Sequence, residues 1–345
     1  MWDKTFFSGA QKIWHMGEWL DWEESLIHAM SHAFHYGTAV FEGIRAYETE
    51  RGPAVFRLKE HLKRLFHSAG VLQMEVPYTR EELFEAVLET LRQNRLRSAY
   101  IRPIIYYSYG NLGLVPHACP VQVTIAAWAW GAYLGKEALE KGVHVLVVPW
   151  RRIHPSQFDM RAKMSGVYVQ SMIAGKFARR HGFGEAVFLN LEERLAEGSG
   201  ENIFIVKSGV LKTNSVEESI LPGITRDTIL KLAADQGIPT RVGPITLDEF
   251  LGADEAFFSG TAAEVTPITR VTDGHDPHRA REGWPTTVIG NGKPGPITRQ
   301  LADLYGRVVR GEEKAYHSWL SWAYQTVEEA QAELAESRHV LSDEF

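Results

Sequence analysis

A lysine among small and apolar residues is the first candidate for chemistry in this chain. Lys163 lies in the run RAKMSGVY, five positions before Tyr168. Desolvation disfavours the charged form of a lysine, so burial would make Lys163 partly neutral and nucleophilic. A neutral amine beside a phenol suits Schiff-base chemistry on a carbonyl. From this segment alone, a surface lysine that extends its ammonium into water is the alternative.

Two stretches in the C-terminal half predict backbone sites for an anion. The run LPGITRD at residues 221–227 leads into a helical pattern, and a helix N-terminus after a glycine presents free N–H groups to phosphate. The run SGTAAE at residues 259–264 follows an apolar strand and is a second candidate nest. Each pattern alone is common. Together with Arg64 they would supply what a phosphate monoester needs.

A tyrosine and an arginine share one face of a predicted strand. The run AYIRPIIYY at residues 99–107 is rich in aromatic and β-branched residues. Side chains alternate along a strand, which places Tyr100 and Arg102 side by side. They offer several donors to a carboxylate, although such a pair also suits a solvated strand face. Pro103 cannot donate to a ladder, so we expect this strand at a sheet edge or bulged there.

Helices and strands around these residues must position them. Residues 57–69 have the periodicity of an amphipathic helix with Arg64 on its flank, where a solvated face is the alternative reading. A second helix begins with a capping box at Thr79 and Glu82. Further strands are expected at 121–130, 143–148, 186–190 and 202–206, a helix at 166–180, and a strand-and-loop segment at 31–47.

Composition narrows the class of protein. The chain has 345 residues, which is long for one core, so two domains are expected. Its net charge of -6 gives no basic excess for nucleic acid. A single cysteine, Cys119, excludes an internal disulfide framework and fits a reducing cytosol. Neither a signal peptide nor a membrane span is visible, so we expect a cytoplasmic protein.

Two other motifs do not support a site. His32 and His35 are three residues apart, but no third ligand with zinc-like spacing follows, which argues against a metal centre. The Gly-x-Gly at Gly198 and Gly200 has Ile203 where a dinucleotide loop needs its third glycine, and a strand follows in place of a helix. We therefore reject a Rossmann site.

In chain order, the motifs resemble a fold-type-IV pyridoxal-phosphate (PLP) aminotransferase, and most closely the branched-chain amino acid aminotransferases. The pieces that carry this resemblance are residues 31–47, 60–65, 100–103, 130–135, 197–202, 221–227, 259–267 and 292–301. They extend to about Trp322 in the family's order. Their co-occurrence is far more specific than any one piece.

The resemblance implies a role for each matching residue. Lys163 would form the Schiff base and shuttle the proton, and Glu197 would keep the pyridine nitrogen protonated, so that the ring acts as an electron sink. Tyr168 would bind the phenolic oxygen of the cofactor. The remaining cofactor contacts would come from Arg64, Leu221, Ile224, Thr225 and Thr261. The substrate would contact Tyr36, Phe41, Tyr100, Arg102, Trp130, Thr261 and Ala262.

The implied reaction is ping-pong transamination of L-leucine, isoleucine or valine with 2-oxoglutarate, in branched-chain amino acid biosynthesis. The implied fold is a two-domain α+β or α/β enzyme, like D-amino acid aminotransferase. A small N-terminal α/β domain would cover residues 1–130, a linker 131–138, and a larger C-terminal domain with a β-barrel-like core 139–345. The family's loop near Leu112 reaches the partner subunit, which implies a homodimer or a higher homo-oligomer.

Departures from the family pattern leave the substrate range open. Met164 and Val167 are larger or more apolar than usual, and the hairpin before Glu197 carries Glu192, Glu193 and Arg194 where a glycine turn is common. The acidic run at residues 327–336 is expected to be a surface helix or partly disordered. A D-amino acid or (R)-amine transaminase and an aminodeoxychorismate-type lyase are the alternatives on the same fold. A non-catalytic PLP-binding protein is a further one, because fold alone does not fix function.

Overall fold

The computed structural model describes residues 7–130 and 136–335, which form two units. The first unit contains the described residues of 7–130, 162–166 and 307–335, and the second contains 136–161 and 167–306. Two segments that the sequence placed in the C-terminal domain, 162–166 and 307–335, thus belong to the first unit. The expected boundaries at 130 and 138 stay a prediction, and residues 131–135 lie outside the described residues.

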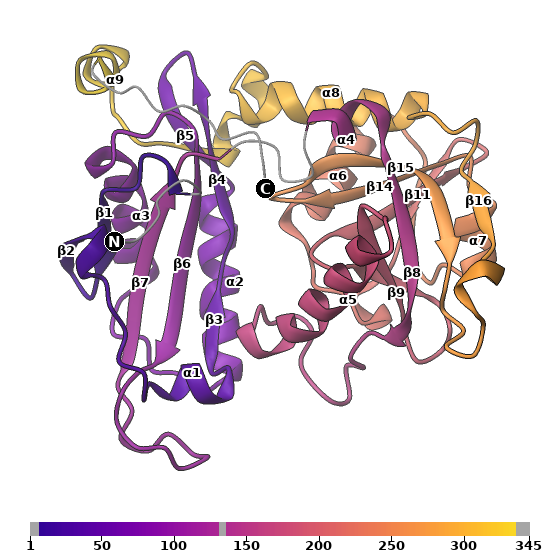
Figure 1. Cartoon of the computed structure of the whole chain (residues 1–345). Coiled ribbons are helices and arrows are strands. Elements are labelled where there is room, and N and C mark those ends of the chain that lie inside the picture. The colour runs from indigo at the N-terminus through magenta and orange to yellow at the C-terminus, as the bar shows by residue number, and fades with distance from the viewer. Residues whose placement is uncertain (1–6, 131–135, 336–345) are drawn as a thin grey trace. The chain divides into compact units, whose positions relative to one another are not determined.

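The first unit is built on an eight-stranded sheet (Figure 1). Its strand order is β17-β5-β4-β6-β7-β1-β2, and β3 also pairs with β6. The elements are β1 (Lys12–His15), β2 (Glu18–Asp21), α1 (His32–Tyr36), β3 (Ala39–Phe41), β4 (Ile44–Thr49), β5 (Gly52–Phe56), α2 (Leu58–Val71), α3 (Arg80–Gln93), β6 (Ala99–Tyr107), β7 (Val121–Trp128), β17 (Leu320–Trp322) and α9 (Val327–Leu334).

Helices α2 and α3 confirm the two helices that the sequence periodicity predicted. The α2 stripe of Leu58, Leu62, Leu65 and Ala69 is buried, and α3 begins with the predicted capping box at Thr79. At residues 31–47 the expected strand and loop are present as β3, β4 and their short connection, but the short helix α1, which the sequence did not predict, comes before them.

Strand β6 lies inside the sheet, so the edge predicted from Pro103 is wrong. On one side β6 pairs with β7 along its length, Pro103 being opposite Ile125. On the other side the partner changes from β4, which ends its pairing at Ile101, to β3, which begins at Ile104. Pro103 falls in this gap, where its carbonyl accepts a hydrogen bond from the Glu42 amide at 3.0 Å. A residue without an N–H is tolerated there because no ladder donor is needed.

The second unit has a nine-stranded sheet in the order β10-β9-β8-β15-β14-β11-β12-β13, with β16 paired to β15. The elements are α4 (Lys136–Lys141), β8 (Val143–Arg151), α5 (Tyr168–Arg180), β9 (Glu185–Leu189), β10 (Leu195–Gly198), β11 (Asn202–Lys207), β12 (Val210–Thr213), α6 (Ile224–Asp235), β13 (Thr240–Val242), α7 (Leu247–Leu251), β14 (Glu255–Gly260), β15 (Glu264–Asp273), β16 (Thr286–Val288) and α8 (Pro296–Val309).

Strand β8 is buried on both faces, which explains its continuous apolar sequence. It pairs in parallel with β9 and β15. Val145 and Val147 join one hydrophobic cluster, whereas Leu146 and Val148 join another that includes Ala174 of α5. Parallel strands covered on both sides characteristically read as uninterrupted apolar runs. Among the described residues, no helix is long and apolar enough to cross a membrane.

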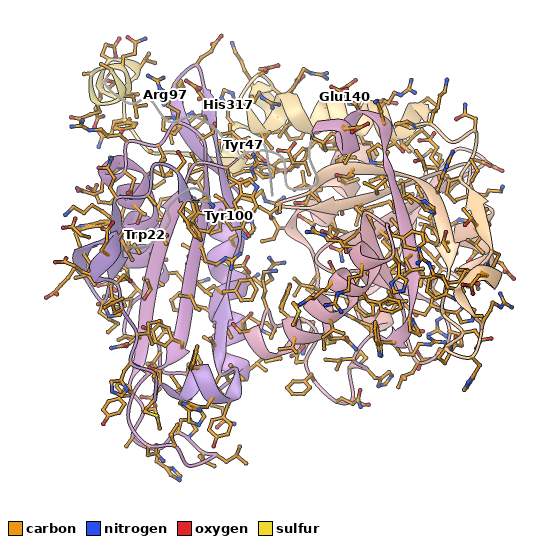
Figure 2. The ribbon with its side chains drawn as sticks, viewed as in Figure 1. Trp22, Tyr47, Arg97, Tyr100, Glu140 and His317 are labelled. Atoms are coloured by element: carbon orange, nitrogen blue, oxygen red, sulfur yellow. The ribbon has the colours of Figure 1, made fainter. Side chains whose placement is uncertain are left out.

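The C-terminal segment returns to the first unit and extends its sheet. Strand β17 pairs antiparallel with β5, with Leu320 opposite Phe56, and the Trp319 carbonyl accepts a 2.7 Å bond from the Arg57 amide at the start of α2. The acidic run expected to be a surface helix forms α9, whose Ala330 and Leu334 are buried. Figures 1 and 2 show α9 beside Arg97, which donates to the Leu334 carbonyl.

A glycine comparison tests the docking of α9 on β5. Gly52 and Gly209 have φ of +89° and +77°, but only at Gly52 would a Cβ clash, 2.7 Å from Cβ of Ala330. The two Gly→Ala changes carry similar backbone strain, so their difference isolates the α9 contact. We expect Gly52→Ala to lower the free energy of unfolding by about 1–3 kcal/mol more than Gly209→Ala. Urea titration measures both. Equal losses would contradict this packing, and truncation after Gln325 should abolish the difference.

Candidate active site

The Lys163 segment is fixed to the first unit through its backbone. The Lys163 amide donates to Ser68 Oγ of α2 at 2.9 Å, and its carbonyl accepts from the Phe41 amide at 3.1 Å. Gly37 allows a close approach here, because a Cβ at this position would lie 2.9 Å from Cα of Gly166. Met164, one of the departures from the family pattern, is buried and bridges to Val40.

The Lys163 side chain is half-buried and lies near an aromatic ring. Its Nζ is 4.9 Å from the centroid of the Phe41 ring, and the Arg102 guanidinium is 4.7 Å from the same centroid. The two side chains therefore lie against one aromatic ring, each within the distance range of a cation–π contact. This contact brings a predicted catalytic residue and two predicted substrate residues together in one unit.

Arg64, the predicted phosphate ligand, is paired with a carboxylate that the sequence interpretation did not single out. Its Nε and Nη2 donate to Oε1 and Oε2 of Glu42 at 2.6 and 2.8 Å. Nδ1 of His61 donates to Oε2 of Glu42 at 2.8 Å. The Glu42 and His61 side chains are fully buried, and Arg64 is 11% exposed. The nearest signal in the sequence is a lone acidic residue between apolar positions 39–41 and 43–44.

In this cluster the favourable interactions of the Glu42 carboxylate with Arg64 and His61 offset the cost of its burial. Burial alone would raise the pKa of the Glu42 carboxyl, but the Arg64 guanidinium and His61 hold it well below its usual range. Burial lowers the pKa of His61, Glu42 opposes this, and the cations of Arg64 and Lys163 add to the lowering. Because its folded pKa is depressed, Glu42 stabilises the fold above about pH 4.3, and this stability is lost as the pH falls through the folded pKa.

The predicted face of β6 carries an aromatic cluster with one cation. Nη2 of Arg102 donates to the Tyr100 hydroxyl at 3.1 Å, which confirms that the two side chains are neighbours. Tyr100 stacks on Trp130 at 4.5 Å and is labelled in Figure 2. Within the described part of the chain, Nε of Arg102 is buried without a hydrogen-bond partner, and Arg102 forms no ion pair. Tyr36 instead donates from α1 to the Leu112 carbonyl.

In the second unit, Glu197 of β10 is buried against a cation from the end of β8. Arg152 contacts Oε1 of Glu197 through Nε at 3.0 Å and Nη2 at 2.9 Å, and both side chains are almost fully buried. Oε2 accepts from the Leu221 amide at 3.0 Å and from Nδ2 of Asn202 at 3.3 Å. Ser171 accepts from the remaining guanidinium nitrogen, Nη1, at 3.1 Å. The carboxylate is therefore held from two sides.

Both predicted anion cradles are connected to this carboxylate network. The first follows Leu221, whose amide donates to Glu197, and the second begins at Ser259, which pairs with Asn202 across the sheet. Helix α6 begins at Ile224 and continues with Thr225, so their amides have no intrahelical partner. A Cβ at Gly223 would lie 2.0 Å from Oδ1 of Asn202, which makes glycine necessary there. Asn202 in turn pairs across the sheet with Ser259.

The second cradle is the tight turn from β14 to β15. Gly260 pairs with Glu264, which leaves Thr261, Ala262 and residue 263 as the loop. Ser259, just before it, has a buried hydroxyl with no hydrogen-bond partner among the described residues. Tyr168, the last predicted cofactor residue, is half-buried at the first position of α5.

Comparison with known proteins identifies the family. The model of the family described as amino-transferase class IV matches residues 39–271. The chain belongs to this family.

Its relatives cover nearly the whole chain. The branched-chain-amino-acid aminotransferase of Pseudomonas aeruginosa is 46% identical over 307 residues, 89% of this chain and 95% of the relative. The crystal structure of the Escherichia coli branched-chain amino acid aminotransferase has a TM-score of 0.85 at 42% identity, covering 91% of this chain and 100% of that one. The enzyme from Thermobaculum terrenum in its PLP form has a TM-score of 0.82 at 33% identity, covering 92% and 99%.

Sequence reasoning missed three ionisable residues of this class IV aminotransferase: Glu42, His61 and Arg152. Arg152 follows directly after Arg151 at the end of an apolar strand, and nothing in the run marks which of the two turns inward. The structure separates them. Arg151 pairs with Glu193, the residue at φ +57° where a turn glycine is common, whereas Arg152 is buried on Glu197.

The Arg152–Glu197 pair gives a prediction for stability. Arg152→Met removes the cation and leaves Glu197 as a buried charge, which costs about 3–5 kcal/mol of unfolding free energy. Adding Glu197→Gln to Arg152→Met removes that uncompensated charge, so the double variant should be the more stable of the two. Urea denaturation of the cofactor-free proteins measures both. A double variant less stable than Arg152→Met would contradict charge compensation as the role of Arg152.

Proposed function

We propose that this protein is a PLP-dependent branched-chain aminotransferase that transfers amino groups between leucine, isoleucine or valine and 2-oxoglutarate in a ping-pong cycle. The observation that carries the proposal is Lys163, a half-buried lysine whose backbone is hydrogen-bonded to α2 and β3 and whose Nζ lies beside the Phe41 ring. Membership of the class IV family and the names of the relatives support the same activity.

The chemistry of the donor set fits a phosphorylated pyridine aldehyde. Arg64 and the first amides of α6, Ile224 and Thr225, are donors of the kind that hold a phosphate, as are the amides of the turn at Thr261. The buried, unpartnered hydroxyl of Ser259 beside that turn is a further donor. When bound, PLP supplies a conjugated ring that takes up the electron pair of the substrate Cα–H bond.

The chain's own residues would move and hold protons. Nζ of Lys163 accepts the Cα proton of the substrate and returns it. Glu197 would accept a hydrogen bond from the ring nitrogen, and Arg152 holds this carboxylate in a fixed orientation. Tyr168 would donate a hydrogen bond to the phenolic oxygen, and Leu221 would pack against the ring. In these roles the protein orients the reacting groups and leaves the bond chemistry to the cofactor.

The aromatic cluster of the first unit explains how one enzyme accepts both apolar and acidic substrates. Phe41, Tyr100 and Trp130 offer an apolar wall to a branched side chain. A γ-carboxylate left bare against such a wall is costly. Arg102, which has no carboxylate partner among the described residues, supplies the compensating charge. Tyr36, and the amides of Thr261 and Ala262, complete the proposed substrate contacts.

We further propose a homodimer. Large apolar side chains are exposed on α1 and on the loop after β6, with Phe34 79% and Leu114 77% exposed. Exposed apolar patches of this kind mark protein–protein contacts. The molar mass of the holoprotein by light scattering tests this: a value near 38.9 kDa, the mass of one chain, would exclude the dimer.

A cytoplasmic location is proposed from the chemistry of Cys119. This thiol is buried and free, and Sγ lies 3.2 Å from the Asn111 carbonyl. The chain holds no second cysteine with which an oxidising compartment would pair it. Recovery of the protein in a periplasmic or secreted fraction would contradict this.

Loss of the amine tests the proposed catalytic role. Lys163→Ala should abolish transamination, and borohydride should no longer fix PLP to the chain, because the covalent bond is made through Nζ. The matched control is Lys176→Ala, an exposed lysine of α5 that should leave both properties unchanged. Mass spectrometry of the reduced protein gives the readout. Covalent trapping that survives Lys163→Ala would refute the assignment.

Loss of the guanidinium tests the acidic-substrate role. A hydrogen bond to a charged group contributes about 1.5–3 kcal/mol, so Arg102→Leu should lower kcat/KM for glutamate and 2-oxoglutarate roughly ten- to a hundredfold. Leucine has no charge to meet a guanidinium in its side chain and should change far less. Half-reactions followed by cofactor absorbance separate the two substrates, and Arg270→Leu, at an exposed site, is the control. Equal losses would make Arg102 structural.

A further inference from the structure

We propose that Glu42, held by His61, is the positioning residue that fixes the Arg64 guanidinium for the cofactor phosphate. This inference rests on the proposed function, because it takes Arg64 as a phosphate ligand. It assigns a role to two residues that carry no part of the chemistry and that the family resemblance did not single out.

Three donors converge on one carboxylate. Arg64 approaches Glu42 with its Nε and Nη2 edge at 2.6 and 2.8 Å, and His61 approaches Oε2 with Nδ1 at 2.8 Å. The planar fork of an arginine matches the two oxygens of a carboxylate, which fixes its direction as well as its distance. Holding Glu42 on the remaining side, His61 stops the carboxylate from rotating away from the fork.

Glu42 itself is anchored by the sheet. It lies in the short connection from β3 to β4, where its amide donates to the Pro103 carbonyl at 3.0 Å. The next residue, Gly43, cannot carry a side chain, since a Cβ would lie 1.9 Å from the Tyr100 hydroxyl oxygen. A long arginine side chain loses rotamer freedom when a ligand orders it. Here the sheet imposes that order in advance.

Positioning and simple electrostatics predict opposite results for loss of the Glu42 charge. The carboxylate repels a phosphate dianion, so on Coulomb's law alone its removal tightens phosphate binding. If Glu42 instead positions Arg64, removal weakens phosphate binding. Glutamine separates the two cases, because it offers one acceptor oxygen and one NH₂ where three donors now converge.

Helix α2, which carries Arg64, also binds the backbone of Lys163. The test must therefore separate weaker phosphate binding from a displaced Lys163. Ser68 donates to the Arg64 carbonyl and accepts from the Lys163 amide, both at 2.9 Å. A general shift of α2 would weaken any aldehyde that reacts with Lys163. Pyridoxal, which lacks the phosphate, reports that general effect. The dissociation constant of pyridoxal divided by that of PLP therefore reports the contribution of the phosphate alone.

The experiment titrates cofactor-free protein with PLP and with pyridoxal and follows absorbance. Glu42→Gln should lower the pyridoxal-to-PLP ratio about ten- to a hundredfold, by weakening PLP. The matched control is Glu60→Gln, which removes a carboxylate on the same helix that pairs with Arg57 at 2.7 Å and should leave the ratio unchanged. A ratio that stays constant or rises in Glu42→Gln overturns the proposal.

A double-variant cycle shows whether Glu42 acts through Arg64. Arg64→Met should also lower the ratio, and adding Glu42→Gln to it should lower the ratio no further. Additive losses would overturn the positioning role. An unchanged ratio in Arg64→Met alone would instead remove Arg64 from the phosphate site, which is a failure of the proposed function and is distinguishable from failure of this inference.

Two His61 variants keep the test open if Glu42→Gln does not fold. His61→Asn retains an N–H donor near the position of Nδ1, whereas His61→Leu removes it. The ratio should fall in His61→Leu and recover in His61→Asn. Equal ratios in these two variants would show that the hydrogen bond to Glu42 has no part in holding the phosphate ligand.

Discussion

Burial of a carboxylate beside a guanidinium is the interaction on which both units depend. Among the described residues each unit contains such a pair, Glu42 with Arg64 in the first and Glu197 with Arg152 in the second. A buried charge without its partner strongly destabilises a protein, whereas a protein in which apolar side chains replace the whole pair is often more stable. Their presence in the structure is therefore better explained by function than by stability. Both carboxylates are also held by further donors, which fixes their direction.

The sheets supply the fixed backbone that these charges need. In the first unit, β6 changes partner at Pro103, and Glu42 enters the interior at that break. In the second unit, Glu197 occupies β10 at one end of the sheet order and is reached from the end of β8 by Arg152. The pairing of β10 with β9 is irregular between Leu195 and Gly198, so each of these two carboxylates lies where strand pairing is interrupted.

Local signals predicted much of the fold, and pairing decided the rest. The stripe of α2, the capping box at Thr79 and the full length of β6 follow from propensity and periodicity. The central position of β6 does not, because Pro103 is tolerated only through a change of partner strand on one side. The neighbourhood of Tyr100 and Arg102 followed from the two-residue period of a strand.

The charged residues of the candidate site divide in the same way. Lys163 stands in a local run with recognisable chemistry, whereas the role of Glu197 was implied by the family resemblance. The roles of Glu42 and Arg152 can be recognised only from their partners Arg64 and Glu197, which are 22 and 45 residues away in the sequence. A single sequence carries no record of those distances. The family resemblance identified the site residues Arg64 and Glu197, whereas the structure identified the charged residues that hold them, Glu42 and Arg152.

Strand β17 and the Trp319 carbonyl give the first unit an unusual order of assembly. Strand β5 and the start of α2 leave the ribosome early, but their partners at residues 319–322 are made only after the whole second unit. During synthesis β5 is therefore an uncovered sheet edge, which is the kind of surface that pairs with other chains. A nascent chain halted before residue 319 would remain exposed to aggregation, however well its second unit had folded.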